Sequence, residues 1–76
     1  MSKYKLRSAI AAVLPDDKLG MRMLTIPTGA TLTLLGTPNI SGLVDAQWEV
    51  ILISVFMRDV VENGELIKEK AVRHDF

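Results

Sequence analysis

The chain has 76 residues, nine Lys and Arg against nine Asp and Glu, and a hydrophobic fraction of 49%. This length predicts one domain with a small core, and the apolar fraction is too high for a disordered protein. There is no cysteine, so disulfides and Cys-ligated metals are excluded. The balanced charge argues against non-specific nucleic-acid binding, which needs a basic surface.

Neither a secretion signal nor a membrane helix is expected from the hydrophobic pattern. The apolar run at 6–14 is broken by Arg7 and Ser8, and no small-residue cleavage site follows it. The next long apolar run, at 50–57, is far shorter than the roughly 20 residues of a membrane helix. We therefore expect a cytoplasmic protein.

Charge is distributed unevenly along the chain. The segment from Met23 to Met57 contains no Lys or Arg, and its only acidic residues are Asp45 and Glu49. The middle of the chain is therefore predicted to supply the core, while the two ends carry most of the charged surface.

Residues 3–14 fit two secondary structures. Alternation of apolar and charged residues favours a strand, whereas Leu6, Ile10 and Val13 also have helical spacing. We prefer the strand because three basic residues in a first turn would oppose a helix dipole. Residues 15–20 then predict a turn, and residues 21–26 a second strand.

The next segment begins with a tight turn. Residues 26–29 (Ile-Pro-Thr-Gly) predict a type I turn. Residues 30–35 alternate Thr with Leu, as in a strand with one buried face. Gly, Pro and Asn between residues 36 and 42 predict a loop.

Two strands are expected in the second half of the chain. Residues 43–49 alternate, with Trp48 on the inner face, and residues 50–57 are apolar enough to be buried on both faces. A hairpin between them would need a turn at 49–51, which lacks the usual Gly, Asn or Asp. Residues 43–57 are thus either a hairpin or one continuous strand exchanged with another molecule.

The C-terminal part is predicted to be short and mixed. Residues 58–64 indicate a helical turn ending at Asn63-Gly64, and residues 65–70 a final short strand. Residues 71–76 are expected to be a flexible tail. The whole chain, 1–76, is read as a single domain.

Three segments carry a resemblance to a known fold: 25–32 (TIPTGATL), 41–49 (SGLVDAQWE) and 55–64 (VFMRDVVENG). Between about Ala9 and Ile67 the chain resembles an SH3-like domain, and it is similar to small uncharacterised bacterial proteins with an Ile-Pro-x-Gly turn. The resemblance implies an all-β, SH3-like small barrel of about five short antiparallel strands, with a helical turn near Arg58–Gly64. It implies no activity, and the loop at 15–22 lacks the aromatic residues of a proline-rich peptide groove.

Four residues are candidate partner contacts. Lys3, Lys5 and Arg7 form a basic stripe on one side of the predicted first strand. We read the stripe as a charged edge that deters aggregation, and alternatively as a weak nucleic-acid contact. Trp48 is read as a core residue, and alternatively as a half-exposed contact.

No catalytic, cofactor or metal site is predicted. His74 is the only histidine and has no second ligand at metal spacing. Asp16 and Asp17 are adjacent turn residues with no general base in view. We therefore expect a non-enzymatic protein-interaction module or small subunit that binds a protein partner or itself, with no small-molecule substrate.

Overall fold

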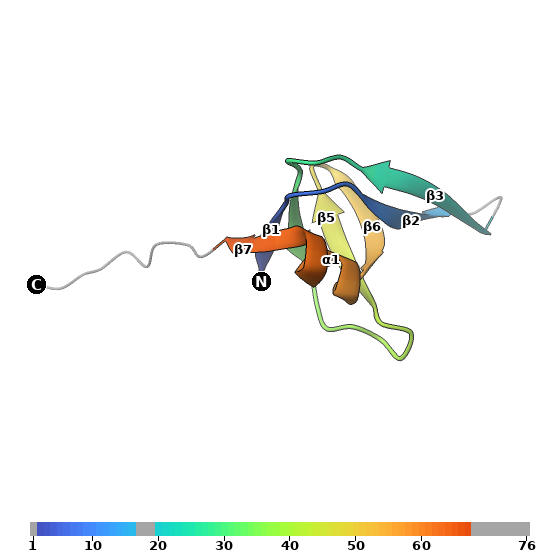
Figure 1. Cartoon of the computed structure of the whole chain (residues 1–76). Helices are drawn as coiled ribbons and strands as arrows, with labels where there is room; N and C mark the ends of the chain where they lie inside the picture. Colours follow the sequence, from blue (N-terminus) through green and yellow to red (C-terminus); the bar gives the residue numbers. More distant parts are fainter. Residues whose placement is uncertain (1, 17–19, 68–76) are drawn as a thin grey trace, which may run out of the picture.

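The computed structural model describes residues 2–16 and 20–67, which form one antiparallel sheet and one short helix (Figure 1). The strands are β1 (Lys3–Leu6), β2 (Ile10–Asp16), β3 (Gly20–Ile26), β4 (Thr31–Leu34), β5 (Leu43–Trp48), β6 (Ile51–Phe56) and β7 (Gly64–Ile67), and the helix is α1 (Met57–Asn63). The predicted tail at 71–76 and the end of the last predicted strand lie outside the described residues.

The strands follow the order β3-β2-β6-β5-β4-β1-β7, and every pairing is antiparallel. The prediction of an all-β fold is confirmed. Seven strands are present where about five were expected, and β3 and β7 are edges that do not pair with each other. The sheet is therefore open along its hydrogen-bonded order.

Residues 3–14 contain two strands instead of one. The backbone of Leu6 donates to the carbonyl of Ala30 and accepts from Gly29, and the N–H of Arg7 donates to Asn63. These bonds hold the end of β1 against two other segments, and the chain bends over residues 7–9 before β2 begins. Local alternation predicted the strand state but not this bend.

The hairpin of β2 and β3 is longer than predicted. Residues 15 and 16 belong to β2 and Gly20 to β3, so three of the six residues of the expected turn are strand. Seven consecutive pairs, from Ile10 opposite Ile26 to Asp16 opposite Gly20, give the ladder its register. Pro15 sits near the end of its strand, a position where the missing N–H is tolerated.

The turn before β4 lies one residue later than predicted. Its hydrogen bond runs from the N–H of Ala30 to the carbonyl of Pro27, with a length of 3.2 Å. Gly29 therefore occupies the third position with φ of 91°, which is the pattern of a type II turn and not of type I. The Gly is required here because a side chain would be strained at this φ.

The loop predicted at 36–42 is present but begins one residue earlier, at Leu35, and one side chain organises it. The Oδ1 atom of Asn39 accepts hydrogen bonds from the N–H groups of Ser41 and Leu43, at 2.8 and 3.0 Å. The Asn39 backbone also exchanges bonds with Gly42 and Leu43. The Gly42 carbonyl in turn accepts from the N–H of Met57, which ties the loop to the start of α1.

Strands β5 and β6 form a hairpin within the chain. Trp48 pairs with Ile51, so Glu49 and Val50 alone make the turn. Glu49 adopts φ of 56°, and Val50 does not have a positive φ. This sign pattern is that of a type II′ turn, in which Gly is the usual first residue.

The prediction that residues 50–57 are buried on both faces is wrong. In β6 the side chains of Ile53 and Val55 are buried, whereas Leu52 is 62% exposed and Phe56 is 40% exposed. Only one face of this strand meets the core, because no second layer of the chain covers its outer face in the described residues.

Helix α1 confirms the predicted helical turn. Gly64 follows the helix with φ of −122°, so it is extended and does not form a left-handed stop. Its reason for being glycine is space: a Cβ atom would lie 2.6 Å from the carbonyl oxygen of Val60. Gly64 therefore packs directly against the last turn of α1 and against β1.

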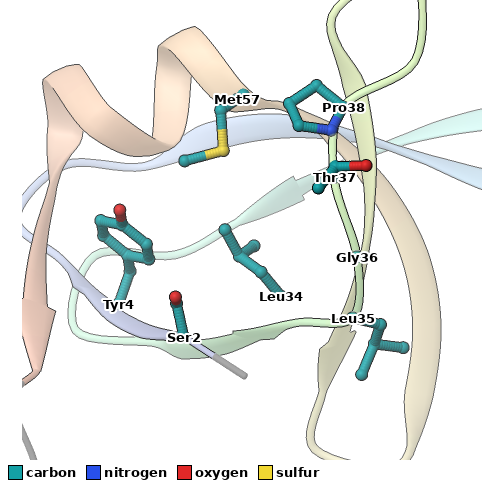
Figure 2. Close-up of a pocket in the computed structure, with 8 residues that line it drawn as sticks. All are labelled: Ser2, Tyr4, Leu34, Leu35, Gly36, Thr37, Pro38 and Met57. Atoms are coloured by element: carbon teal, nitrogen blue, oxygen red, sulfur yellow. The ribbon is translucent and has the colours of Figure 1, made fainter.

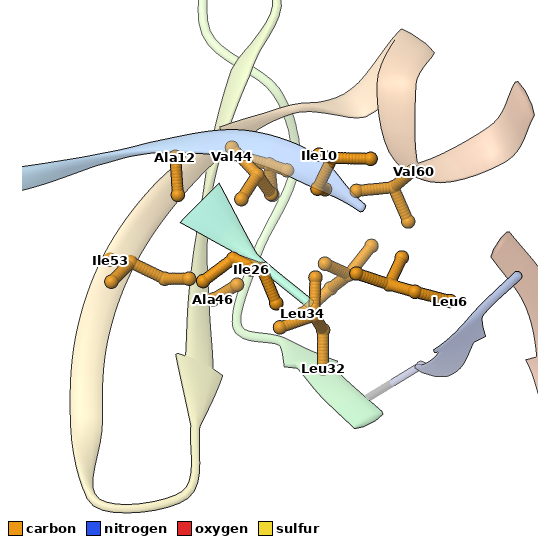
Figure 3. Close-up of a cluster of buried hydrophobic side chains, with 11 residues drawn as sticks. Leu6, Ile10, Ala12, Ile26, Leu32, Leu34, Val44, Ala46, Ile53 and Val60 are labelled. Atoms are coloured by element: carbon orange, nitrogen blue, oxygen red, sulfur yellow. The ribbon is translucent and has the colours of Figure 1, made fainter. Parts of the chain in front are cut away.

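The core lies between the inner faces of the strands and α1 (Figure 3). It consists of Leu6, Ile10, Ala12, Ile26, Leu32, Leu34, Val44, Ala46, Ile53, Val55 and Val60. Seven of these eleven residues fall between 23 and 57, as the charge pattern predicted. The remaining four come from β1, β2 and α1, so the ends of the chain close the core.

Candidate interaction surfaces

The two lysines of the predicted basic stripe lie on one face of β1. Both are exposed, and they stand opposite Thr33 and Thr31 of β4. On the other side of β1, Lys5 stands directly opposite Glu65 of β7. An opposite charge in direct register reduces the positive potential that an acidic partner would meet.

Arg7 does not extend the stripe. It follows the end of β1, where the chain bends, and its Nη2 atom donates to the carbonyl of Gly64 at 3.4 Å. The predicted set of three aligned positive charges is thus divided into a pair of strand lysines and one arginine that contacts the α1–β7 junction.

Trp48 is intermediate between the two states predicted for it, a core residue and a half-exposed contact. Its side chain is half-buried and packs against the core from the end of β5, where it pairs with Ile51. It anchors the β5–β6 hairpin next to the strained turn at Glu49. The prediction of an inward-facing strand position is confirmed, and part of the ring remains accessible.

The outer face of the sheet is apolar at one end. Pro15 stands opposite Met21, and Val13 stands opposite both Met23 and Ser54, so these side chains share a face with Leu52. We call the set Val13, Pro15, Met21, Met23 and Leu52 the outer apolar face. Met21 and Met23 are 71% and 65% exposed. A shallow pocket of about 240 Å³ lies between Pro15 and Leu52, and Asp45 and Ser54 also line it.

The other end of the same face is polar. Next to Leu52, the hydroxyl of Ser54 donates to Asp45 at 3.3 Å, and Gln47, Thr33 and Lys3 continue across the sheet. Sequence reasoning missed the outer apolar face. The sequence does show that Met21 and Met23 occupy alternate positions, which places them on one face of a strand. Which side chains share that face follows only from the pairing of β2 with both β3 and β6.

A second hollow lies between β1, the loop at 35–42 and α1, and Leu35 lines both this hollow and the pocket beside Leu52. The second hollow has a volume of about 430 Å³, and Tyr4, Leu34, Pro38 and Met57 are among its lining residues (Figure 2). Pro38 and Met57 also line a neighbouring hollow of about 520 Å³ that includes Phe56. The lining of the 430 Å³ hollow is mainly apolar with a few hydroxyl groups, which suits contact with an uncharged group, whereas the neighbouring hollow also includes Arg58 and Asp59.

The possible metal ligands in the described part of the chain, residues 2–16 and 20–67, are Asp and Glu residues. No group of three His, Cys, Asp or Glu residues comes together there. His74 and Asp17 lie outside this part of the chain. Within the same residues, α1 is the one helix, and it is too short to cross a membrane.

Comparison of the chain with protein-family models, with curated proteins and with solved structures finds no match. The functional argument therefore rests on the surfaces described above.

Proposed function

We propose that this chain is a non-catalytic protein-interaction module with an SH3-like arrangement, and that it self-associates as a small subunit. It would act by contact, through the outer apolar face. The observation that carries this proposal is the concentration of exposed apolar side chains on β2, β3 and β6.

The order of the elements supports the SH3-like part of the proposal. The β2–β3 hairpin occupies the place of a long first loop, the Pro27–Ala30 turn leads into β4, and α1 lies directly before the last strand. The sheet does not close, so the support comes from connections and strand order.

The composition of the outer apolar face supports the interaction part. Isolated apolar residues are normal on a protein surface, but a contiguous group surrounded by polar residues marks an interaction site. Met21, Met23 and Leu52 are each more than 60% exposed, and the described side chains of the face carry no charge. A chain with nine positive and nine negative residues also has little net repulsion between copies.

The alternative of nucleic-acid binding through Lys3, Lys5 and Arg7 receives less support. Glu65 stands opposite Lys5, and Arg7 is turned toward Gly64. Two exposed lysines would give only a weak, salt-dependent attraction to phosphate.

Self-association is tested by sedimentation equilibrium from micromolar to millimolar protein. We expect a reversible monomer–dimer equilibrium, and Met23→Lys should weaken the association at least tenfold because a buried charge opposes contact. The matched control is Val61→Lys, which places the same charge at a 53% exposed position on α1.

A strict monomer at millimolar concentration would contradict the proposed self-association. Equal weakening by Met23→Lys and Val61→Lys would show that added charge, and not the outer apolar face, determines the result.

A further inference from the structure

Strand β3 is an edge of the sheet along its full length. It is seven residues long, and in the described residues it pairs only with β2. In such an edge, alternate backbone N–H and C=O groups point away from the sheet and are free to pair with another strand. Figure 1 shows the β2–β3 hairpin extending to one side, away from α1 and β7.

We infer that β3 pairs antiparallel with β3 of a second copy, about a two-fold axis at Met23, so that one continuous sheet crosses the dimer. This inference rests on the proposed self-association and specifies its contact.

The sequence of β3 lacks three of the devices that protect an edge, and its one charge is Arg22 on the inner face. It contains no Lys and no Pro, and its seven-pair ladder with β2 has no bulge. The other edge, β7, has four residues in the described part of the chain and presents Glu65. Of the two edges, β3 is thus the one with the longer described strand, which is largely apolar apart from Arg22.

The residues of β3 are compatible with pairing to themselves. An axis at Met23 places Met23 opposite its own copy and Met21 opposite Thr25, all on the outer face. On the inner face it places Arg22 opposite Leu24. An axis at Arg22 would instead place two arginines directly opposite each other, which is unfavourable. Met23 is the central residue of β3, so an axis there is the one that pairs all seven residues of the strand.

The size of the contact predicts a weak dimer. Seven residues at about 3.4 Å each give a strand of roughly 24 Å. A single pair of such strands buries less than the roughly 1,200 Å² of a standard stable interface. We therefore expect dissociation constants in the micromolar range or weaker, which is why the test includes covalent trapping.

Cysteine trapping tests the inference in the full chain, which has no cysteine of its own. With Met23→Cys, directly opposed Cα atoms would be about 4.5–5.5 Å apart, within the range of a disulfide. Leu52→Cys is the matched control, because Leu52 is similarly exposed at 62% but lies two strands from the edge. Five strand spacings of about 4.8 Å would separate the two copies of Leu52 by roughly 24 Å.

We expect mild oxidation to give at least ten times more disulfide-linked dimer from Met23→Cys than from Leu52→Cys, measured on non-reducing gels. Val61→Lys, which lies outside the outer apolar face, should leave the sedimentation equilibrium unchanged. Circular dichroism of each variant checks that the fold is retained.

Two failures are distinguishable. A reversible dimer that cross-links through Leu52→Cys, or through neither cysteine, overturns strand pairing and leaves self-association standing. A strict monomer in sedimentation overturns both the proposed self-association and the strand pairing.

Discussion

At the scale of single residues, the main conflict between sequence and structure is at Glu49. A non-glycine residue with a positive φ costs about 1–2 kcal/mol, and Glu49 adopts φ of 56°. Six pairs between β5 and β6 hold the two strands on either side of this turn. The turn forms because the paired strands, with Val44, Ala46, Ile53 and Val55 in the core, outweigh its local strain.

Replacing Glu49 with Gly should stabilise the protein by about 0.5–1 kcal/mol, since relief of strain exceeds the entropy that Gly adds to the unfolded chain. Urea unfolding followed by circular dichroism measures the change. The matched control is Val50→Gly, at a 91% exposed turn position without a positive φ, which should lose about 0.5–1 kcal/mol. A loss of stability in Glu49→Gly would contradict the proposed strain.

At the scale of elements, local pattern predicted which segments are strands, and contacts between segments fixed their limits. The alternation of Thr31–Leu34 and Leu43–Trp48 gave the correct buried faces. The bend after β1 and the shift of the Pro27–Ala30 turn depend on hydrogen bonds to distant residues. These partners cannot be read from a local window of sequence.

The junction of α1 with β7 gives an element-scale prediction. Gly64→Ala would place Cβ 2.6 Å from the Val60 carbonyl and 3.4 Å from a methyl group of Leu6, so the helix end must move away from β1. We expect a loss of about 1–3 kcal/mol in urea unfolding. Gly36→Ala is the control, because no atom lies within 4 Å of its new Cβ and φ is not positive there. Equal effects at the two positions would argue against a packing origin.

At the scale of the whole molecule, a single core joins all strands but β7 with α1. A domain of this size has a stability of only several kcal/mol, so loss of one large core side chain is a large fraction of it. The outer face contributes little, because its apolar residues remain in water in the monomer.

Neighbouring residues of β6 test this division. Ile53→Ala should cost about 2–4 kcal/mol because Ile53 is 2% exposed, whereas Leu52→Ala should change stability by less than about 0.5 kcal/mol.

Unfolding at low protein concentration should give the same midpoint by Trp48 fluorescence and by far-UV circular dichroism, as expected for one cooperative unit. Separate midpoints would indicate that the β5–β6 hairpin unfolds independently.

The sequence by itself determined the all-β class, most of the strands, the helical turn and the source of the core. These follow from the local alternation of apolar and polar residues and from the segment 23–57, which has no basic residue. Both patterns can be read directly from neighbouring positions in the sequence. Among the candidate contacts, it placed Lys3 and Lys5 on one exposed face and Trp48 at an inward strand position.

Only the tertiary structure decided which apolar residues stay outside. Met21, Met23 and Leu52 are apolar, as the core residues are, and each lies in a strand. Their exposure follows from the pairing of β2 with β6 and from the position of β3 at the edge, with no further layer of described chain to cover them. Strand pairing joins residues far apart in sequence, so the surface on which the proposed function depends exists only in the folded sheet.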